Sequence, residues 1–160
     1  MRRLAYVALL ALAAASLGSC RKSQSTRDVI ARAYDIEPDW NDSSKLIPLN
    51  YSQTQGKRLF YTYCVWCHAD STPAGPSNRS NLNPSGALAN DGATLNPMSN
   101  EFLRNMITLG GSAMGKSAMM PPYGRTLSQQ DIDDVIAFTR AIAQPPYTPP
   151  VRPGPEYNVK

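Results

Sequence analysis

The segment Cys64-Val65-Trp66-Cys67-His68 places two cysteines and the only histidine of the 160-residue chain within one pentapeptide. Its pattern, C-x-x-C-H, is typical of the covalent attachment of haem. The two intervening residues set the sulfurs at the separation of the two vinyl groups on one haem edge, so that each thiol can form a thioether. The adjacent histidine then lies under the iron and offers a ring nitrogen as an axial ligand. The pentapeptide therefore predicts one covalent haem c bound by Cys64, Cys67 and His68.

Three other uses of these residues remain as alternatives. A thioredoxin-like dithiol follows a strand in a βαβ unit, whereas a helical pattern precedes Cys64. A zinc site needs four ligands, and the domain holds no further cysteine or histidine beyond this pentapeptide. A disulfide between Cys64 and Cys67 would leave the histidine without a role. Haem attachment is the interpretation that uses all three residues.

Helical periodicity of apolar residues occurs three times between residues 51 and 144. The patterns predict helices over about residues 54–63 and 100–109, and a third helix that begins after Ser128. Residues 71–98 are rich in Asn, Pro and Gly, as is typical of loops, and no convincing alternating strand pattern occurs. The sequence therefore predicts a small all-α fold with long loops. The expected boundary residues are the N-caps Ser99 and Ser128, the latter facing Asp131 as in a capping box, and the stops Gly110 and Pro145.

The stretch 51–144 resembles the class I c-type cytochromes in four features that occur in the family's order. A glycine and an aromatic residue on the first helix match an aromatic residue on the last. The C-x-x-C-H motif comes next, a Gly-Pro pair follows it, and a Met-Pro loop precedes the last helix. The resemblance implies a domain of about three to four helices wrapped around one haem. The residues that carry it are Gly56, Phe60 and Phe138; Cys64, Cys67 and His68; Gly75-Pro76; and Ala118-Met119-Met120-Pro121-Pro122-Tyr123-Gly124.

The same resemblance implies how the iron is held. In the family, a proline carbonyl accepts the Nδ1 hydrogen of the axial histidine, and this role falls on Pro76. The methionine that directly precedes a proline supplies the second axial ligand, so Met120 is expected to face His68 across the iron. Met119 is the runner-up, and three other methionines are weaker candidates: Met98, Met106 and Met114. Two histidine ligands are excluded within a monomer because the chain has one histidine.

The two ends of the chain predict an export signal and an extended tail. Residues 1–19 combine a basic start with an apolar run that is too short to span a bilayer, as in a signal peptide. The run ends at Leu17-Gly18-Ser19-Cys20, which resembles a bacterial lipoprotein signal and implies that Cys20 carries the lipid. An ordinary secretory signal with a chance cysteine is the alternative. Residues 20–50 are expected to form a polar tether, residues 51–144 the cytochrome domain, and residues 145–160 a proline-rich extended tail.

These features predict a one-electron carrier rather than an enzyme. An iron with two protein ligands has no open position, so no small-molecule substrate is expected. The donor and acceptor would be redox proteins or a membrane respiratory or photosynthetic complex, and the lipid would hold the protein on the periplasmic side of a bacterial membrane. The alternative is a haem-based sensor or peroxidase-like domain with an open sixth position. The net charge of +4 falls to +2 without Arg2 and Arg3, which is too small for a nucleic-acid binder.

Overall fold

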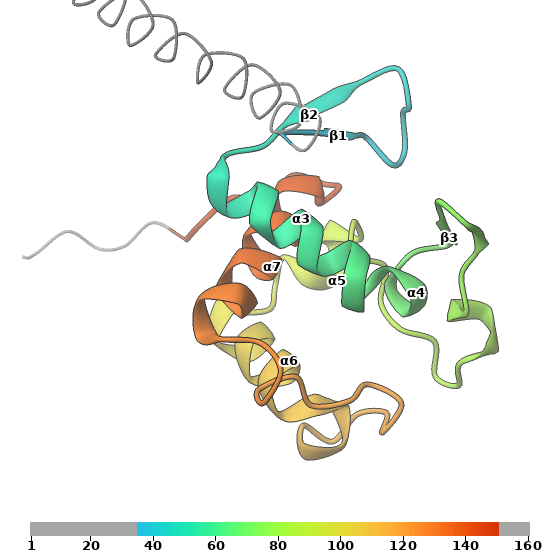
Figure 1. Ribbon diagram of the computed structural model, residues 1–160, viewed down its shortest axis with the longest axis vertical. Helices are drawn as coiled ribbons and strands as arrows, with labels where there is room; N and C mark the ends of the chain where they lie inside the picture. Colours follow the sequence, from blue (N-terminus) through green and yellow to red (C-terminus); the bar gives the residue numbers. More distant parts are fainter. Residues whose placement is uncertain (1–34, 151–160) are drawn as a thin grey trace, which may run out of the picture. The chain divides into compact units, whose positions relative to one another are not determined.

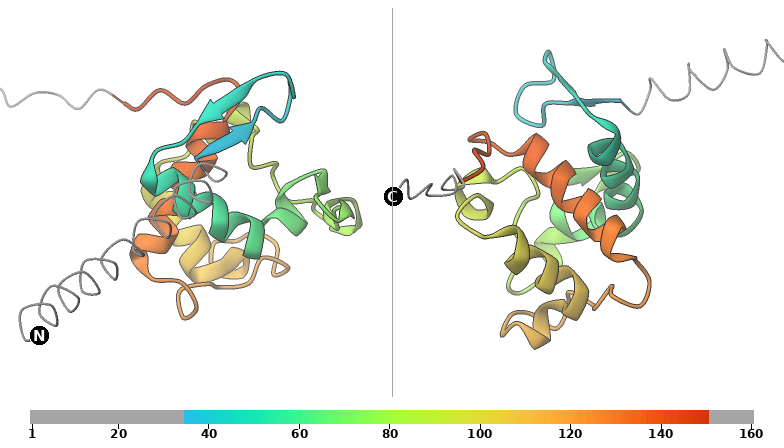
Figure 2. Two further views of the ribbon diagram at one scale, coloured as in Figure 1. Left: turned by 45° about the horizontal axis from the view of Figure 1, so that its top comes forward. Right: turned by 90° about the vertical axis from the view of Figure 1, so that its left-hand side faces the viewer.

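The crossing of two helices from opposite ends of the domain forms its framework. The computed structural model describes residues 35–150, and within them α3 (Tyr51–Tyr63) packs against α7 (Gln129–Ile142) (Figures 1 and 2). A Cβ on Gly56 would lie 1.8 Å from the carbonyl oxygen of Asp134, so only glycine allows this approach. Beside the crossing, the rings of Phe60 and Phe138 are buried with centroids 5.4 Å apart. The predicted contact of Gly56, Phe60 and Phe138 is confirmed.

Side-chain caps decide where the two crossing helices begin. At α7 the Ser128 hydroxyl accepts from the backbone N–H of Asp131, and the Asp131 carboxylate accepts from the backbone N–H of Ser128, which confirms the predicted capping box. At α3 the side chains and backbones of Asn50 and Gln53 pair in the same way. This second box starts α3 three residues before the predicted start at residue 54.

A third long helix, α6 (Asn100–Ala113), carries a break near its end. Ser99 caps its start through the backbone N–H of Phe102, as predicted. Gly110 adopts φ 79° and ψ 167°, so the regular helix stops at this residue and a short turn follows it. The predicted stop is therefore confirmed in its position, although the helical segment continues beyond it to Ala113.

The remaining elements are short and confirm a mainly helical fold. They are α4 (Val65–His68), α5 (Gly92–Leu95), the 3₁₀ turn η1 (Arg79–Asn81), and the two-residue strands β3 (Ser71–Thr72) and β4 (Gly75–Pro76). Two apolar clusters flank α7: one contains Phe60, Phe138 and Ile142, and the other contains Leu127, Ile132 and Ile136. Among residues 35–150, no helix combines the length and the apolar character needed to cross a membrane.

The segment just before α3 corrects the predicted tether. Residues 36–48 form an antiparallel pair, β1 (Ile36–Pro38) with β2 (Leu46–Pro48), which lies near the start of α3 in Figure 1. Glu37 is 1% exposed and joins this pair to α3. Its carboxylate accepts from the Tyr61 hydroxyl at 2.6 Å and lies 2.8 Å from the Lys57 ammonium. The folded domain therefore begins near residue 36 rather than at residue 51.

Trp40 closes the same cluster from the hairpin side. Its indole N–H donates to the Glu37 carboxylate at 2.8 Å, and its ring lies 5.8 Å from that of Phe60. Burial and the adjacent carboxylate both raise the pKa of the Tyr61 phenol above its usual value. The carboxylate thus satisfies two partly buried donors and one cation, and this links the hairpin to the aromatic cluster.

Replacing Glu37 with alanine is expected to destabilise the domain by about 3–5 kcal/mol, because it leaves two donors unpaired and removes the counter-charge of the largely buried Lys57 ammonium. Urea unfolding of the haem-loaded protein measures the change. Asp42→Ala is the matched control, since its pair with Lys45 is exposed and is worth less than about 1 kcal/mol. Equal losses in the two variants would contradict a structural role for the buried pair.

The chain after α7 stays attached to the domain over its first residues. The backbone of Gln144 exchanges hydrogen bonds with Asn90 and Gly92, and the Asn96 amide donates to the carbonyl of Pro145 at 2.9 Å. The Arg140 guanidinium lies 4.1 Å from the centre of the Tyr147 ring. The start of the predicted tail is therefore packed. The signal at residues 1–19, Cys20, the tether up to residue 34 and the tail from residue 151 lie outside the described residues.

Candidate functional site

The two cysteines of the pentapeptide lie on a single helical turn that continues from α3. The backbone N–H of Cys64 donates to Phe60 at 2.8 Å, and the N–H groups of Cys67 and His68 both donate to the Cys64 carbonyl. Both thiols are free and partly buried. The turn therefore presents two thiols and an imidazole from adjacent positions, as the pentapeptide predicts.

Burial keeps the first thiol uncharged. It raises the pKa of Cys64 to about 12, and the neighbouring Cys67 adds to the shift. A thioredoxin-like nucleophile needs the opposite, a thiol whose pKa is lowered toward neutrality. Within residues 35–150 no group of three or more His, Cys, Asp or Glu side chains could hold a metal ion. Neither the dithiol nor the zinc alternative is supported by these surroundings.

The imidazole of His68 is oriented by a backbone carbonyl. Its Nδ1 lies 2.7 Å from the carbonyl oxygen of Ala87. A carbonyl can only accept, so Nδ1 carries the hydrogen, and the lone pair of Nε2 is left for a metal. Such a bond also raises the donor strength of the imidazole.

The prediction that Pro76 supplies this carbonyl is wrong. Pro76 lies in β4, where it pairs with Ser71. Ala87 takes its place, and the preceding Gly86 makes the approach possible. A Cβ on Gly86 would lie 2.8 Å from the Cys67 carbonyl oxygen and 3.3 Å from His68 Nδ1. Every residue has a carbonyl that can accept a hydrogen bond, so the sequence could not show which one meets the histidine. The only feature that pointed to this position was a second glycine after the histidine.

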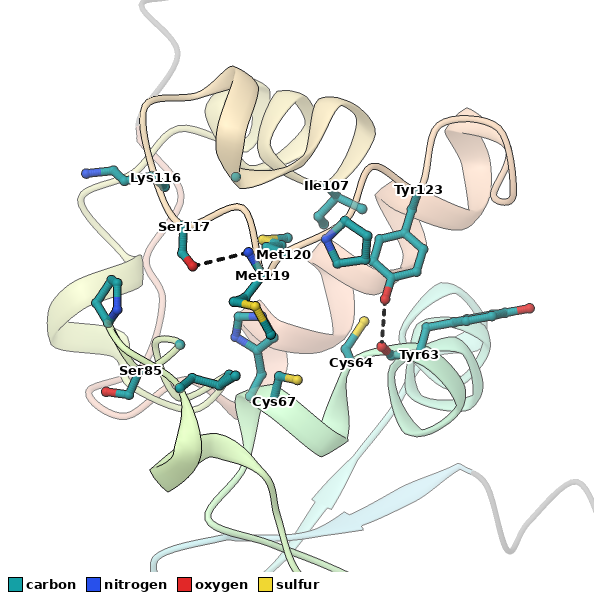
Figure 3. Close-up of a pocket in the computed structure, with 16 residues that line it drawn as sticks. Tyr63, Cys64, Cys67, Ser85, Ile107, Lys116, Ser117, Met119, Met120 and Tyr123 are labelled. Carbon is teal, nitrogen blue, oxygen red and sulfur yellow. Dashed lines mark hydrogen bonds between the residues drawn. The ribbon is translucent and has the colours of Figure 1, made fainter.

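Two cavities of about 200 and 270 Å³ meet at the pentapeptide. Figure 3 shows the first, with Cys64 and Cys67 on one side and Met119 and Met120 facing them from the segment before α7. The second extends between α3, α6 and α7 and is lined almost wholly by apolar side chains. Five residues line both cavities, which makes them two parts of one slot: Cys64, His68, Ile107, Lys116 and Met120.

The methionines differ in their positions around this slot. Met120 lines both cavities, as His68 does, whereas Met119 lines only the first and is 61% exposed. Met98 and Met106 line only the second cavity. Met114 is the C-cap of α6 and is not among the residues that line the two cavities. Of the candidates, Met120 is the one placed with His68 at the junction.

The slot fits a covalently bound haem by its chemistry. Free thiols lie at its edge beside an imidazole whose Nε2 is available, and a thioether comes from a separate segment. The remaining walls are mostly apolar, which suits a large macrocycle with a small net charge. Cys64, Cys67 and His68 would hold the group, and it would supply one-electron chemistry between ferric and ferrous iron.

A comparison with protein-family models finds one described as cytochrome c oxidase, cbb3-type, subunit III, over residues 52–138. The match covers 87 of 160 residues, which is more than half of the chain. It runs from the first turn of α3 to Phe138 and includes the pentapeptide and the methionine segment. No curated protein and no solved structure matches the chain.

Proposed function

We propose that this chain, which belongs to the family of cytochrome c oxidase, cbb3-type, subunit III, is a one-electron carrier. The family's c-type cytochrome domain carries haem-based electron transfer. In this chain, His68 and Met120 would be the axial ligands. A single observation carries the ligand assignment. His68 and Met120 come from separate segments, and both lie at the junction of the two cavities. His68 and Met120 would together hold the iron and leave no open position for a substrate, and the bound haem would supply one-electron chemistry.

Attachment would use the free thiols of both cysteines. Cys64 and Cys67 would each hold the group through a thioether, made by adding S–H across a vinyl group, an addition that would need no oxidant. The helical backbone hydrogen bonds of Cys64 and Cys67, at 2.8 and 3.1 Å, keep both sulfurs on one edge of the slot. Covalent attachment prevents loss of the group outside the cytoplasm.

The protein also favours a small structural change between the two oxidation states. His68 is held through Ala87, and mostly apolar walls surround the slot beside it. A thioether opposite an imidazole stabilises the ferrous state relative to two imidazoles. These residues therefore favour a relatively high reduction potential and fast transfer.

Optical spectra of the exported, haem-loaded protein test the proposal, in both oxidation states and with carbon monoxide. A low-spin spectrum with a sulfur-to-iron charge-transfer band and no response to carbon monoxide is expected. A high-spin spectrum, or ready carbon monoxide binding, would reject the carrier and support the sensor or peroxidase-like alternative.

The partner is proposed to be a respiratory complex at the membrane, as the family's description suggests. Three apolar side chains beside the cysteines are exposed and can meet such a partner: Trp66 at 53%, Tyr63 at 39% and Met119 at 61%. Lys57 contributes little to electrostatic steering, because Glu37 neutralises it. Contact through these apolar residues brings the thioether edge close to the partner's redox centre.

We also propose that Cys20 anchors the protein through a lipid on the periplasmic side of a bacterial membrane. The wild-type protein is expected to incorporate labelled palmitate and to enter detergent extracts of membranes, whereas Cys20→Ser is expected to lose the label. Ser23→Ala is the matched control and keeps it. Labelled Cys20→Ser protein would contradict this site of lipidation.

A further inference from the structure

We infer that Gly110 and Gly111 are positioning residues that fix Met120 at the iron by letting its segment pack directly on the broken end of α6. The inference rests on the proposed His68 and Met120 ligation. The segment concerned runs from residue 116 to residue 124, and we call it the methionine loop. Its backbone bonds to α6, and its side chains line the slot.

At the Gly110 break, backbone hydrogen bonds within α6 are replaced by backbone hydrogen bonds to the methionine loop. In a continuous helix, the carbonyls of Ile107 and Thr108 would accept from the N–H groups of residues 111 and 112. Here they accept from the N–H groups of Tyr123 at 2.9 Å and Gly124 at 3.1 Å. The N–H of Gly111 is also released, and it donates to the Met120 carbonyl at 2.9 Å. The bonds that α6 gives up are therefore remade with the methionine loop, one of them at Met120 itself.

Only glycine fits at the two positions of the break. The φ 79° and ψ 167° of Gly110 belong to a backbone region that is essentially restricted to glycine. A Cβ there would lie 2.9 Å from the Met120 carbonyl oxygen and 2.8 Å from the Pro122 nitrogen. A Cβ on Gly111 would lie 2.0 Å from the Ser117 carbonyl oxygen. A side chain at either position would push the loop away from α6 and displace Met120.

The other side of the loop is held to the cysteine turn. The Tyr123 hydroxyl donates to the Tyr63 carbonyl at 3.0 Å, and the two rings meet edge to face, as Figure 3 shows. Tyr63 directly precedes Cys64. The loop is thus fixed between α6 and the segment that carries the two cysteines, so a displacement at Gly111 would move the Met120 side chain relative to His68.

Gly111→Ala tests the inference, and Gly115→Ala is the matched control. Gly115 lies in the adjacent turn with φ +67°, but a Cβ there would meet no atom within 4 Å. Imidazole binding to the ferric protein is the readout, because imidazole binds only when the methionine leaves the iron. The affinity for imidazole is expected to rise roughly tenfold to hundredfold in Gly111→Ala, in line with the strain of overpacking, and to stay unchanged in Gly115→Ala.

A purely structural role for the glycines would lower the melting temperature of both variants and leave imidazole affinity at the wild-type value, and this result would overturn the inference. If Gly111→Ala yields no haem-loaded protein, Gly124→Ala replaces it. Its Cβ would press on the same contact, 2.7 Å from the Thr108 methyl and 2.9 Å from its carbonyl oxygen, and imidazole affinity must again rise. If the wild-type protein already bound carbon monoxide readily, this result would instead contradict the ligation by His68 and Met120 on which the inference rests.

Discussion

Replacing Met120 with leucine is expected to open the sixth coordination position of the haem iron. Leucine keeps nearly the same volume at the junction of the two cavities but offers no donor atom. The ferrous protein should then bind carbon monoxide, and the sulfur-to-iron charge-transfer band should vanish. Axial ligands move haem potentials over about 0.8 V in all, so loss of the thioether should lower the potential by on the order of 0.1 V.

Met119→Leu is the matched control for this experiment. Met119 is adjacent in the chain and also carries a thioether, but it is 61% exposed and lines only one of the cavities. Its replacement should leave the spectrum and the potential as they are in the wild type. If Met119→Leu opened the iron and Met120→Leu did not, Met119 would be the ligand. If neither did, the sixth ligand would come from another residue.

Gly56→Ala is expected to destabilise the domain by about 3 kcal/mol or more, which lies at the upper end for a single added methyl group. The new Cβ would lie 1.8 Å from the Asp134 carbonyl oxygen and 2.9 Å from the Val135 nitrogen. Both are backbone atoms of α7, so no side chain can turn aside and the helices must separate. Separation would also part Phe60 from Phe138, which line the interior next to the slot.

Thermal unfolding followed by circular dichroism measures this loss in the haem-loaded protein. Tyr51→Ala on the same helix is the control, since its side chain is 79% exposed and its removal should change stability by less than about 0.5 kcal/mol. A Gly56→Ala protein as stable as the control would show that the two helices can move apart at no cost, and would contradict the close crossing.

The parts of the fold that follow from local patterns could be predicted well. Ser128 and Asp131 are three residues apart, so the start of α7 is readable in the sequence. The stop at Gly110 is likewise local. The Asn50 and Gln53 capping box obeys the same rule with less common residues, and its omission shortened the predicted first helix.

The hairpin before α3 could not be predicted, because its partners are distant in the sequence. Ile36–Pro38 and Leu46–Pro48 are too short to show an alternating pattern, and the segment between them is polar. Its buried residue is a carboxylate, which in an isolated sequence indicates exposure. Glu37 is buried because Lys57 and Tyr61, both on α3, satisfy it.

The sequence by itself determined the chemistry of this protein, and the tertiary structure decided the geometry that holds it. Cys64, Cys67 and His68 are side chains at a fixed local spacing, so the haem attachment proposed for them can be inferred without coordinates. The carbonyl of Ala87 and the contacts of Gly111 involve backbone atoms that every residue shares, and segments far apart in the chain bring them together. A sequence shows which side chains are available, but only the fold fixes which backbone atoms meet them.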